Sequence, residues 1–102
     1  MTSKNEENKV TVVSQTKRVS NESDSSRKFN IAMDVQMSDG KITLFNNGSV
    51  FPLETVNGGN GSFSLSDDNF TFNSWGFTKQ QNRDAMNAVF TFIDDAQSSL
   101  TE

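Results

Sequence analysis

The chain has 102 residues, of which 32% are hydrophobic, and it carries a net charge of −4. A chain of this length forms one domain at most, and so little apolar material predicts a small core. It contains no cysteine, no histidine and no tyrosine. These absences exclude disulfides, thiol chemistry, histidine-dependent nucleophiles and nearly all zinc sites.

Charge is distributed unevenly along the chain. Residues 1–28 carry six basic and four acidic side chains, whereas residues 29–102 carry three basic and nine acidic ones. Because an acidic body repels a phosphate backbone, only the N-terminal arm is expected to attract nucleic acid. The N-terminus lacks the apolar segment of a signal peptide, and no run approaches the length of a membrane span. We therefore expect a soluble cytoplasmic protein.

The first part of the chain predicts a tail, a strand and a loop. Residues 1–8 are polar and show no apolar periodicity, so we expect a flexible tail followed by a single domain over 9–102. Residues 20–26 (SNESDSS) are turn formers and predict a loop. Within 9–19 a strand is favoured by the valines, which are Val10, Val12, Val13 and Val19.

The clearest strand pattern lies in residues 27–37. Alternate positions there are apolar, namely Phe29, Ile31, Met33, Val35 and Met37. A period of two indicates one buried and one solvated face, as in an antiparallel sheet. Ser38-Asp39-Gly40 follows and predicts a hairpin turn, because glycine tolerates a positive φ.

Residues 41–46 are expected to form the partner strand. Ile42 and Leu44 are two residues apart and are placed on one face by the alternation. Phe45 falls out of phase with both, so we expect its ring to be partly exposed.

The next strand is expected after an Asn-Gly dipeptide. Asn47-Gly48 is the strongest short hairpin signal in the chain, and it predicts a turn there. Residues 49–56 then form a third strand of the meander. Because Pro52 cannot donate to a ladder, we expect this strand at a sheet edge or with a bulge at the proline.

A glycine-rich loop and two short strands complete the expected sheet. Residues 57–61 (NGGNG) predict a loose loop. Residues 62–66 and 69–73 alternate between apolar and polar side chains, and Asp67-Asp68 forms the turn between them.

The periodicity changes to that of a helix from Thr78 to about Ser98. Thr78, with Gln81 three residues later, has the pattern of a capping box. Spacings of three and four residues predict one apolar stripe, made of Met86, Val89, Phe90, Ile93, Ala96 and Leu100. The sequence thus predicts an α+β fold, an antiparallel β-meander of about five strands with one C-terminal amphipathic helix packed on one face.

No residues have the spacing of a catalytic, metal or cofactor site. Residues 58–61 lack the lysine and the following helix of a phosphate-binding loop. The acidic pairs 67–68 and 94–95 are adjacent in sequence, so their carboxylates are expected to point apart. Serine is plentiful, but no histidine is present to act as its base. We therefore expect a non-enzymatic protein without a cofactor or metal.

Four residues are the candidates for contact with a partner. Trp75 lies near the expected strand-to-helix corner, beside Phe77, and Phe92 lies off the centre of the apolar stripe, so these rings are expected to be partly exposed. Asp94 and Asp95 fall near the helix C-terminus, where negative charge is unfavourable by about 0.3–1 kcal/mol each. We interpret this pair as an acidic patch for a basic partner.

These features favour a small acidic interaction protein that docks on another protein. In size and acidity the chain resembles the host-directed inhibitors made by phages and mobile elements, which implies inhibition of a host defence or nucleic-acid-processing complex. A second hypothesis is a single-stranded nucleic-acid-binding module that uses the basic N-terminal arm and the strand aromatics. A third is a structural or self-assembling component, most simply a homodimer.

Overall fold

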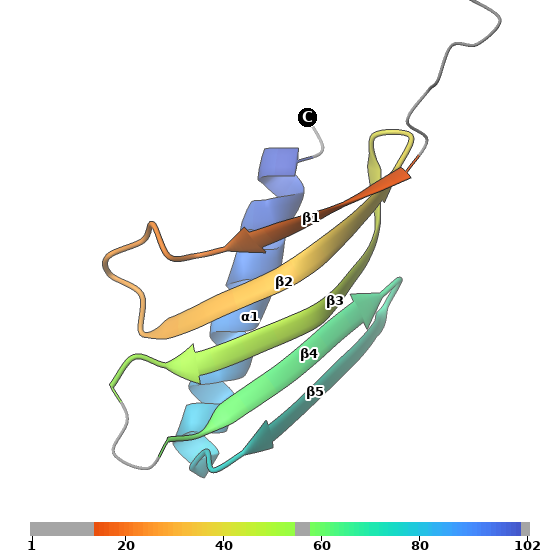
Figure 1. The fold of residues 1–102 in the computed structure, drawn as a ribbon. Helices are drawn as coiled ribbons and strands as arrows, with labels where there is room; N and C mark the ends of the chain where they lie inside the picture. The colour runs from red at the N-terminus through yellow and green to blue at the C-terminus, as the bar shows by residue number, and fades with distance from the viewer. Residues whose placement is uncertain (1–13, 55–57, 101–102) are drawn as a thin grey trace, which may run out of the picture.

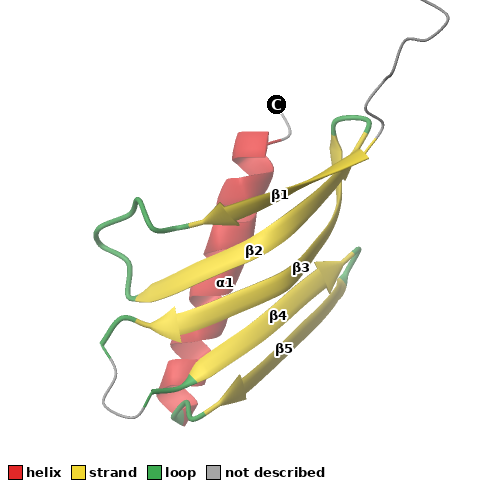
Figure 2. Cartoon of the chain, in the orientation of Figure 1, coloured by secondary structure: helices red, strands yellow, loops and turns green. Residues whose placement is uncertain are grey.

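The computed structural model describes residues 14–54 and 58–100. Within them the chain forms β1 (Ser14–Ser20), β2 (Phe29–Ser38), β3 (Lys41–Pro52), β4 (Asn60–Ser66), β5 (Asn69–Trp75) and α1 (Lys79–Leu100). Consecutive strands pair antiparallel in the order β1-β2-β3-β4-β5 (Figure 1). The helix lies across one face of this sheet, which gives two layers (Figure 2). The predicted α+β meander with one C-terminal helix is therefore confirmed. The predicted tail and the valines at 10, 12 and 13 lie outside the described residues.

The core lies between α1 and the strands β2, β3 and β4. All five alternating apolar residues of β2 are buried, as the period-two pattern predicts. On the helix the buried residues are Ala85, Val89, Ile93 and Ala96, and they join the β2 side chains in one cluster. Each large aliphatic side chain buried there contributes about 1.5–3 kcal/mol to folding. This face of the sheet therefore has to remain against α1.

The start of α1 is set by the predicted capping box. The backbone N–H of Gln81 donates to Oγ1 of Thr78 at 3.0 Å, and the backbone N–H of Thr78 donates to Oε1 of Gln81 at 2.9 Å. These two bonds satisfy donors that the first turn of a helix leaves without partners. Ser74 of β5 also bonds to Asn82, which ties the end of the last strand to the first turn of the helix.

Two residues of the predicted apolar stripe are exposed. Met86 is 37% exposed and Phe90 is 43% exposed. The buried face is centred on the two alanines and the residues between them, so Met86 and Phe90 lie on its flank. That flank faces β5, because the ring of Phe90 lies 4.5 Å from the ring of Phe70 between centroids.

The two expected turns on either side of residues 41–46 have different outcomes. At the first, Asp39 and Gly40 both have positive φ, 55° and 78°, as a type I′ hairpin turn requires. At the second, Asn47 has a φ of 52°, but Gly48 is not left-handed and pairs with Phe63 of β4. The predicted Asn-Gly hairpin is therefore wrong. The dipeptide forms a bulge, and β3 continues through it to Pro52.

The bulges of β3 explain why its predicted faces are also wrong. Met37 pairs with Ile42 and Gln36 pairs with Leu44, so β3 has one extra residue there and its alternation is shifted. Ile42 packs against the core and Leu44 lies on the opposite face, whereas Phe45 is 3% exposed. The expectation that Phe45 is partly exposed fails for this reason.

Pro52 does not mark a sheet edge, because β3 is the central strand. It is the last residue of β3, and the next backbone N–H, that of Leu53, donates to the carbonyl of Lys28 at 3.0 Å. A proline at the end of a ladder removes no interior hydrogen bond, which is why the central strand tolerates it.

We expect Gly48→Ala to destabilise the fold by about 1–3 kcal/mol, which is typical of overpacking. A Cβ atom at residue 48 would lie 2.5 Å from the ring of Phe63, so the ring or the bulge must move. Urea denaturation followed by circular dichroism measures the change. Ser49→Ala is the matched control, since Ser49 is only half-buried, and it should change stability by less than about 0.5 kcal/mol. An unchanged midpoint for Gly48→Ala would contradict the packing of Phe63 on the glycine.

Candidate functional site

The face of the sheet opposite α1, the outer face, is polar and almost without charge. Register and alternation assign its residues as Ser14, Thr16, Arg18, Ser20, Asn30, Ala32, Asp34, Gln36, Ser38, Lys41, Leu44, Asn46, Ser49, Phe51, Asn60, Ser62, Ser64, Ser66, Asn69, Thr71, Asn73 and Trp75. Serine, threonine and asparagine dominate this set. Its charged members on the described strands are Arg18, Asp34 and Lys41, and the first two have opposite signs and pair with each other.

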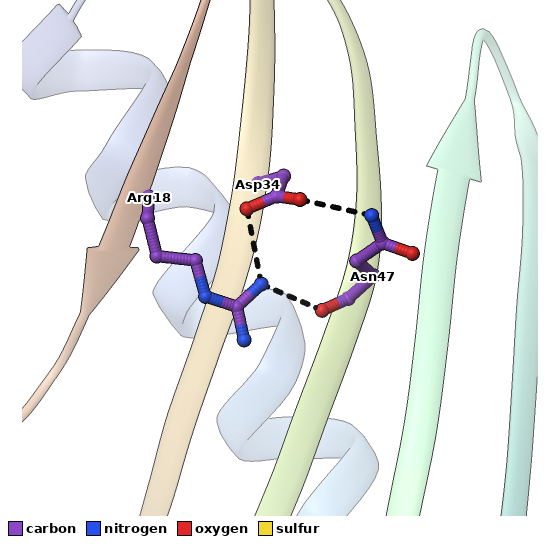
Figure 3. A network of polar contacts seen from close by, with 3 residues as sticks. All are labelled: Arg18, Asp34 and Asn47. Carbon is purple, nitrogen blue, oxygen red and sulfur yellow. Dashed lines mark hydrogen bonds and ion pairs between the residues drawn. The ribbon is translucent and has the colours of Figure 1, made fainter.

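Arg18 and Asp34 bond to each other and to the bulge of β3 (Figure 3). Nη1 of Arg18 donates to Oδ1 of Asp34 at 3.1 Å and to the carbonyl oxygen of Asn47 at 2.8 Å. Nδ2 of Asn47 donates to the second carboxylate oxygen of Asp34 at 2.9 Å. The network joins β1, β2 and β3 on the outer face, and it neutralises the arginine there.

The carboxyl of Asp34 is stabilised in its charged form by these contacts. The side-chain hydrogen bond from Asn47 lowers its pKa most, and the hydrogen bond from Arg18 lowers it further. The pKa of Asp24, in the loop between β1 and β2, is lowered in the same direction by hydrogen bonds from the side chain and backbone of Ser26. The ionised form of each acid therefore stabilises the folded state more than its protonated form does.

Two exposed aromatic rings lie at one end of the outer face. Val50 pairs with Gly61, so one residue further along Phe51 lies beside Asn60, and Asn60 pairs with Trp75. Trp75 is 71% exposed and Phe51 is 47% exposed. Two strand spacings separate the rings, so their backbones lie about 10 Å apart. We call these three residues, Phe51, Asn60 and Trp75, the aromatic patch.

The predicted residues Phe92 and Asp95 lie on the other side of the molecule. Together with Asp24, Arg27 and other residues, they line a groove of about 420 Å³ between the β1–β2 loop and α1. Phe92 is half-buried against the core, and Asp95 is exposed. The guanidinium of Arg27 is held within the loop and its flank, since Nη1 donates to the carbonyl of Asp24 and Nε to Oδ1 of Asn30. The groove therefore has a mixed lining, with apolar side chains such as Phe29 and Phe92 beside charges of both signs.

The four residues predicted for partner contact do not form one site. Trp75 is on the outer face, whereas Phe92 and Asp95 line the groove beside the helix. Asp94 is exposed on α1 and does not line that groove. Sequence reasoning missed Phe51, which completes the aromatic patch with Trp75. Its signal was its alternation with Val50, because two adjacent apolar residues of one strand point to opposite faces.

Over 14–54 and 58–100, no three acidic side chains are grouped so that they could hold a metal ion. Among the same residues, no helix has both the length and the apolar character needed to cross a membrane. No protein-family model, no curated protein and no solved structure matches the chain.

We expect the stability conferred by the Arg18–Asp34–Asn47 network to depend on pH. Because folding lowers the pKa of Asp34, this contribution is complete above the unfolded-state pKa of about 3.9, and it is lost as the pH falls through the lower folded-state value. Asp34→Asn should therefore flatten the acid side of the stability profile, as measured by urea midpoints at decreasing pH.

Asp24→Asn is the matched comparison for that profile. Asp24 accepts from Ser26, outside the network, so its effect should add to that of Asp34→Asn. Arg18→Gln should reproduce part of the Asp34→Asn effect. If Asp34→Asn and the unsubstituted chain lose stability in parallel as the pH falls, the network does not contribute as described.

Proposed function

We propose that this chain is a non-enzymatic interaction protein that docks on another protein through the outer face of its sheet. Trp75 and Phe51 are the anchors of this contact. The observation that carries the proposal is the 71% exposure of Trp75 on a structured strand, next to a second exposed ring. Exposing large rings to water forgoes the stabilisation that burial gives, so the fold gains nothing from them in this position.

The residues around the rings support contact with a protein. Trp and Phe are enriched at interfaces, where a central ring buries much area at low entropic cost. Around the aromatic patch the sheet presents small neutral groups, such as Asn30, Ser62 and Asn73. Serine and asparagine beside aromatic anchors are also the chemistry of antibody binding loops, where they supply adaptable hydrogen bonds.

Electrostatics favour a protein over a nucleic acid on this face. Phosphate recognition requires unpaired positive charge, and affinity then falls steeply with salt. Arg18 lies on the outer face but is paired with Asp34 at 3.1 Å. Lys41, also on this face, lies at the opposite end of β3 from Phe51. A chain that acts by covering a surface on its partner blocks whatever else uses that surface, which is how docking leads to inhibition.

We expect Trp75→Ala to weaken binding to the partner by more than about 30-fold, the effect of losing an interface hot spot. The tagged chain is used to recover a stoichiometric partner from a cell lysate, and the affinity of that partner is then measured for each variant by calorimetry. Phe51→Ala should weaken binding in the same direction. Neither change should alter the free energy of unfolding by more than about 0.5 kcal/mol, because both rings are exposed.

Phe90→Ala is the control for the general loss of an exposed ring. Phe90 is 43% exposed, close to the value for Phe51, but it lies on α1 on the other side of the sheet. At concentrations where the chain is monomeric, this variant should bind one copy of the partner as the unsubstituted chain does. Recovery of no partner, or unchanged affinity in Trp75→Ala, would contradict the proposal.

A second candidate is single-stranded nucleic-acid binding by the same two rings. Bases stack on exposed aromatics with about 1–3 kcal/mol each, and Trp75 and Phe51 are spaced within reach of one short strand. Because the chain carries a net charge of −4 and Arg18 on this face is paired with Asp34, we expect fluorescence anisotropy of a labelled oligonucleotide to stay flat at low salt into the tens of micromolar. A salt-sensitive rise that Trp75→Ala abolishes would favour this candidate over protein docking.

A further inference from the structure

The two edges of the sheet differ in how they are protected. Natural edge strands usually carry charges or proline, which prevent pairing with another strand. β1 follows this rule with Lys17 and Arg18. β5 has the sequence NFTFNSW, which contains no charged residue and no proline. Its outward edge pairs with no strand in the described part of the chain, because β5 is last in the sheet order.

An apolar strip continues from this edge onto the helix. Phe70 and Phe72 of β5 are only partly buried, and their rings stack with centroids 6.5 Å apart. The ring of Phe90 in α1 is 43% exposed, and its centroid lies 4.5 Å from the centroid of the Phe70 ring. Met86 lies one helical turn before Phe90. We call these four residues, Phe70, Phe72, Met86 and Phe90, the edge strip. A contiguous strip of this kind beside an open strand edge is a surface that another strand would cover.

We infer that β5 pairs antiparallel with β5 of a second copy of this chain, which extends two five-strand sheets into one and covers the edge strip of both copies. The inference is independent of the proposed function, since it uses the free edge of β5 and the helix side of the sheet rather than the outer face.

A two-fold axis at Phe72 aligns the full length of both strands. Phe72 then faces its own copy on the helix side, where the two edge strips meet. On the outer face, Thr71 lies opposite Asn73 of the other copy, and Asn69 lies opposite Trp75. Every residue in this alignment is neutral, so no like charges oppose each other across the pairing.

The charges that flank β5 favour the antiparallel orientation and a second copy as the occupant. Asp67 and Asp68 precede the strand, and Lys79 follows it at the start of α1. Antiparallel pairing brings the acidic turn of each copy toward the end at which the other carries its lysine. Parallel pairing would bring the two acidic turns together. The edge is thus complementary to itself in polarity and charge.

The test is the molar mass of the full chain in solution, measured by sedimentation equilibrium from micromolar to millimolar concentration. We expect the mass to rise with concentration to twice the 11.3 kDa of one chain. Thr71→Lys with Asn73→Lys places introduced lysines opposite one another across the two-fold axis, and this variant should remain monomeric. Thr71→Lys with Asn73→Glu uses the same two exposed positions but opposes unlike charges, so it should still dimerise.

The inference would be overturned by a monomer at every concentration, by a double-lysine variant that dimerises as well as the unsubstituted chain, or by a lysine–glutamate variant that stays monomeric. Far-ultraviolet circular dichroism verifies that both variants fold, as expected for substitutions at exposed strand positions. Hydrogen exchange on the unsubstituted chain gives a second readout. The amides of β5 should become more protected as concentration rises, while those of β1 should not, and equal behaviour of the two edges would also overturn it.

Discussion

The bulge at Asn47–Gly48 decides which side chains of the central strand reach the core. It inserts one residue into β3, so the alternation on its two sides is out of step and both Phe45 and Val50 can face α1. A regular strand could not bury both, because they are five positions apart and an odd number of positions reverses the face.

The bulge is stabilised from both faces of the sheet. On the helix side Phe63 occupies the space that a Cβ of Gly48 would fill, and on the outer face the carboxylate of Asp34 accepts from the Asn47 amide. Packing and polar contacts therefore stabilise the same irregularity, and the rest of the sheet is built on its register.

The parts of the fold that depend on neighbours in the sequence could be predicted. The alternation of β2, the Asp39–Gly40 turn and the capping box of α1 each involve residues that contact one another within a few positions, and all three are confirmed.

The hairpin prediction at Asn47-Gly48 is wrong because a hairpin and a bulge begin with the same left-handed asparagine. What separates them is the conformation of Gly48, and that depends on Phe63, fifteen residues away in β4. The same applies to Met86 and Phe90, whose spacing fits the apolar stripe but whose exposure depends on where α1 crosses the sheet. The spacing of apolar residues in the sequence establishes that a helix is amphipathic, whereas tertiary packing determines the centre of its buried face.

The candidate site was predictable only as individual residues. A tryptophan at a strand-to-helix corner indicates an exposed ring, and Trp75 has one. Phe51 lies two strands away on the same face, and no local pattern shows that the two residues are brought together. Phe92 and Asp95 were grouped with Trp75 because all were expected at the surface. The sheet separates them, since α1 lies on one face and Trp75 points from the other. An expectation that a residue is exposed gives no information about which side of a two-layer fold that residue occupies.

The outer face and the β5 edge are physically separate, yet β5 connects them. Trp75 is the last residue of the strand whose edge is free, and its side chain points away from the edge strip. Pairing two copies through β5 would leave both outer faces uncovered and coplanar, with each Trp75 opposite an asparagine of the other copy. Two aromatic patches would then lie on one continuous sheet at fixed spacing.

A partner with two copies of the same binding surface would contact both patches at once. The second contact would then form at a high effective concentration without any new interaction. Because one patch of two rings is small beside a standard interface of about 800 Å² per partner, such doubling is the most direct way for a chain of this size to hold a large target.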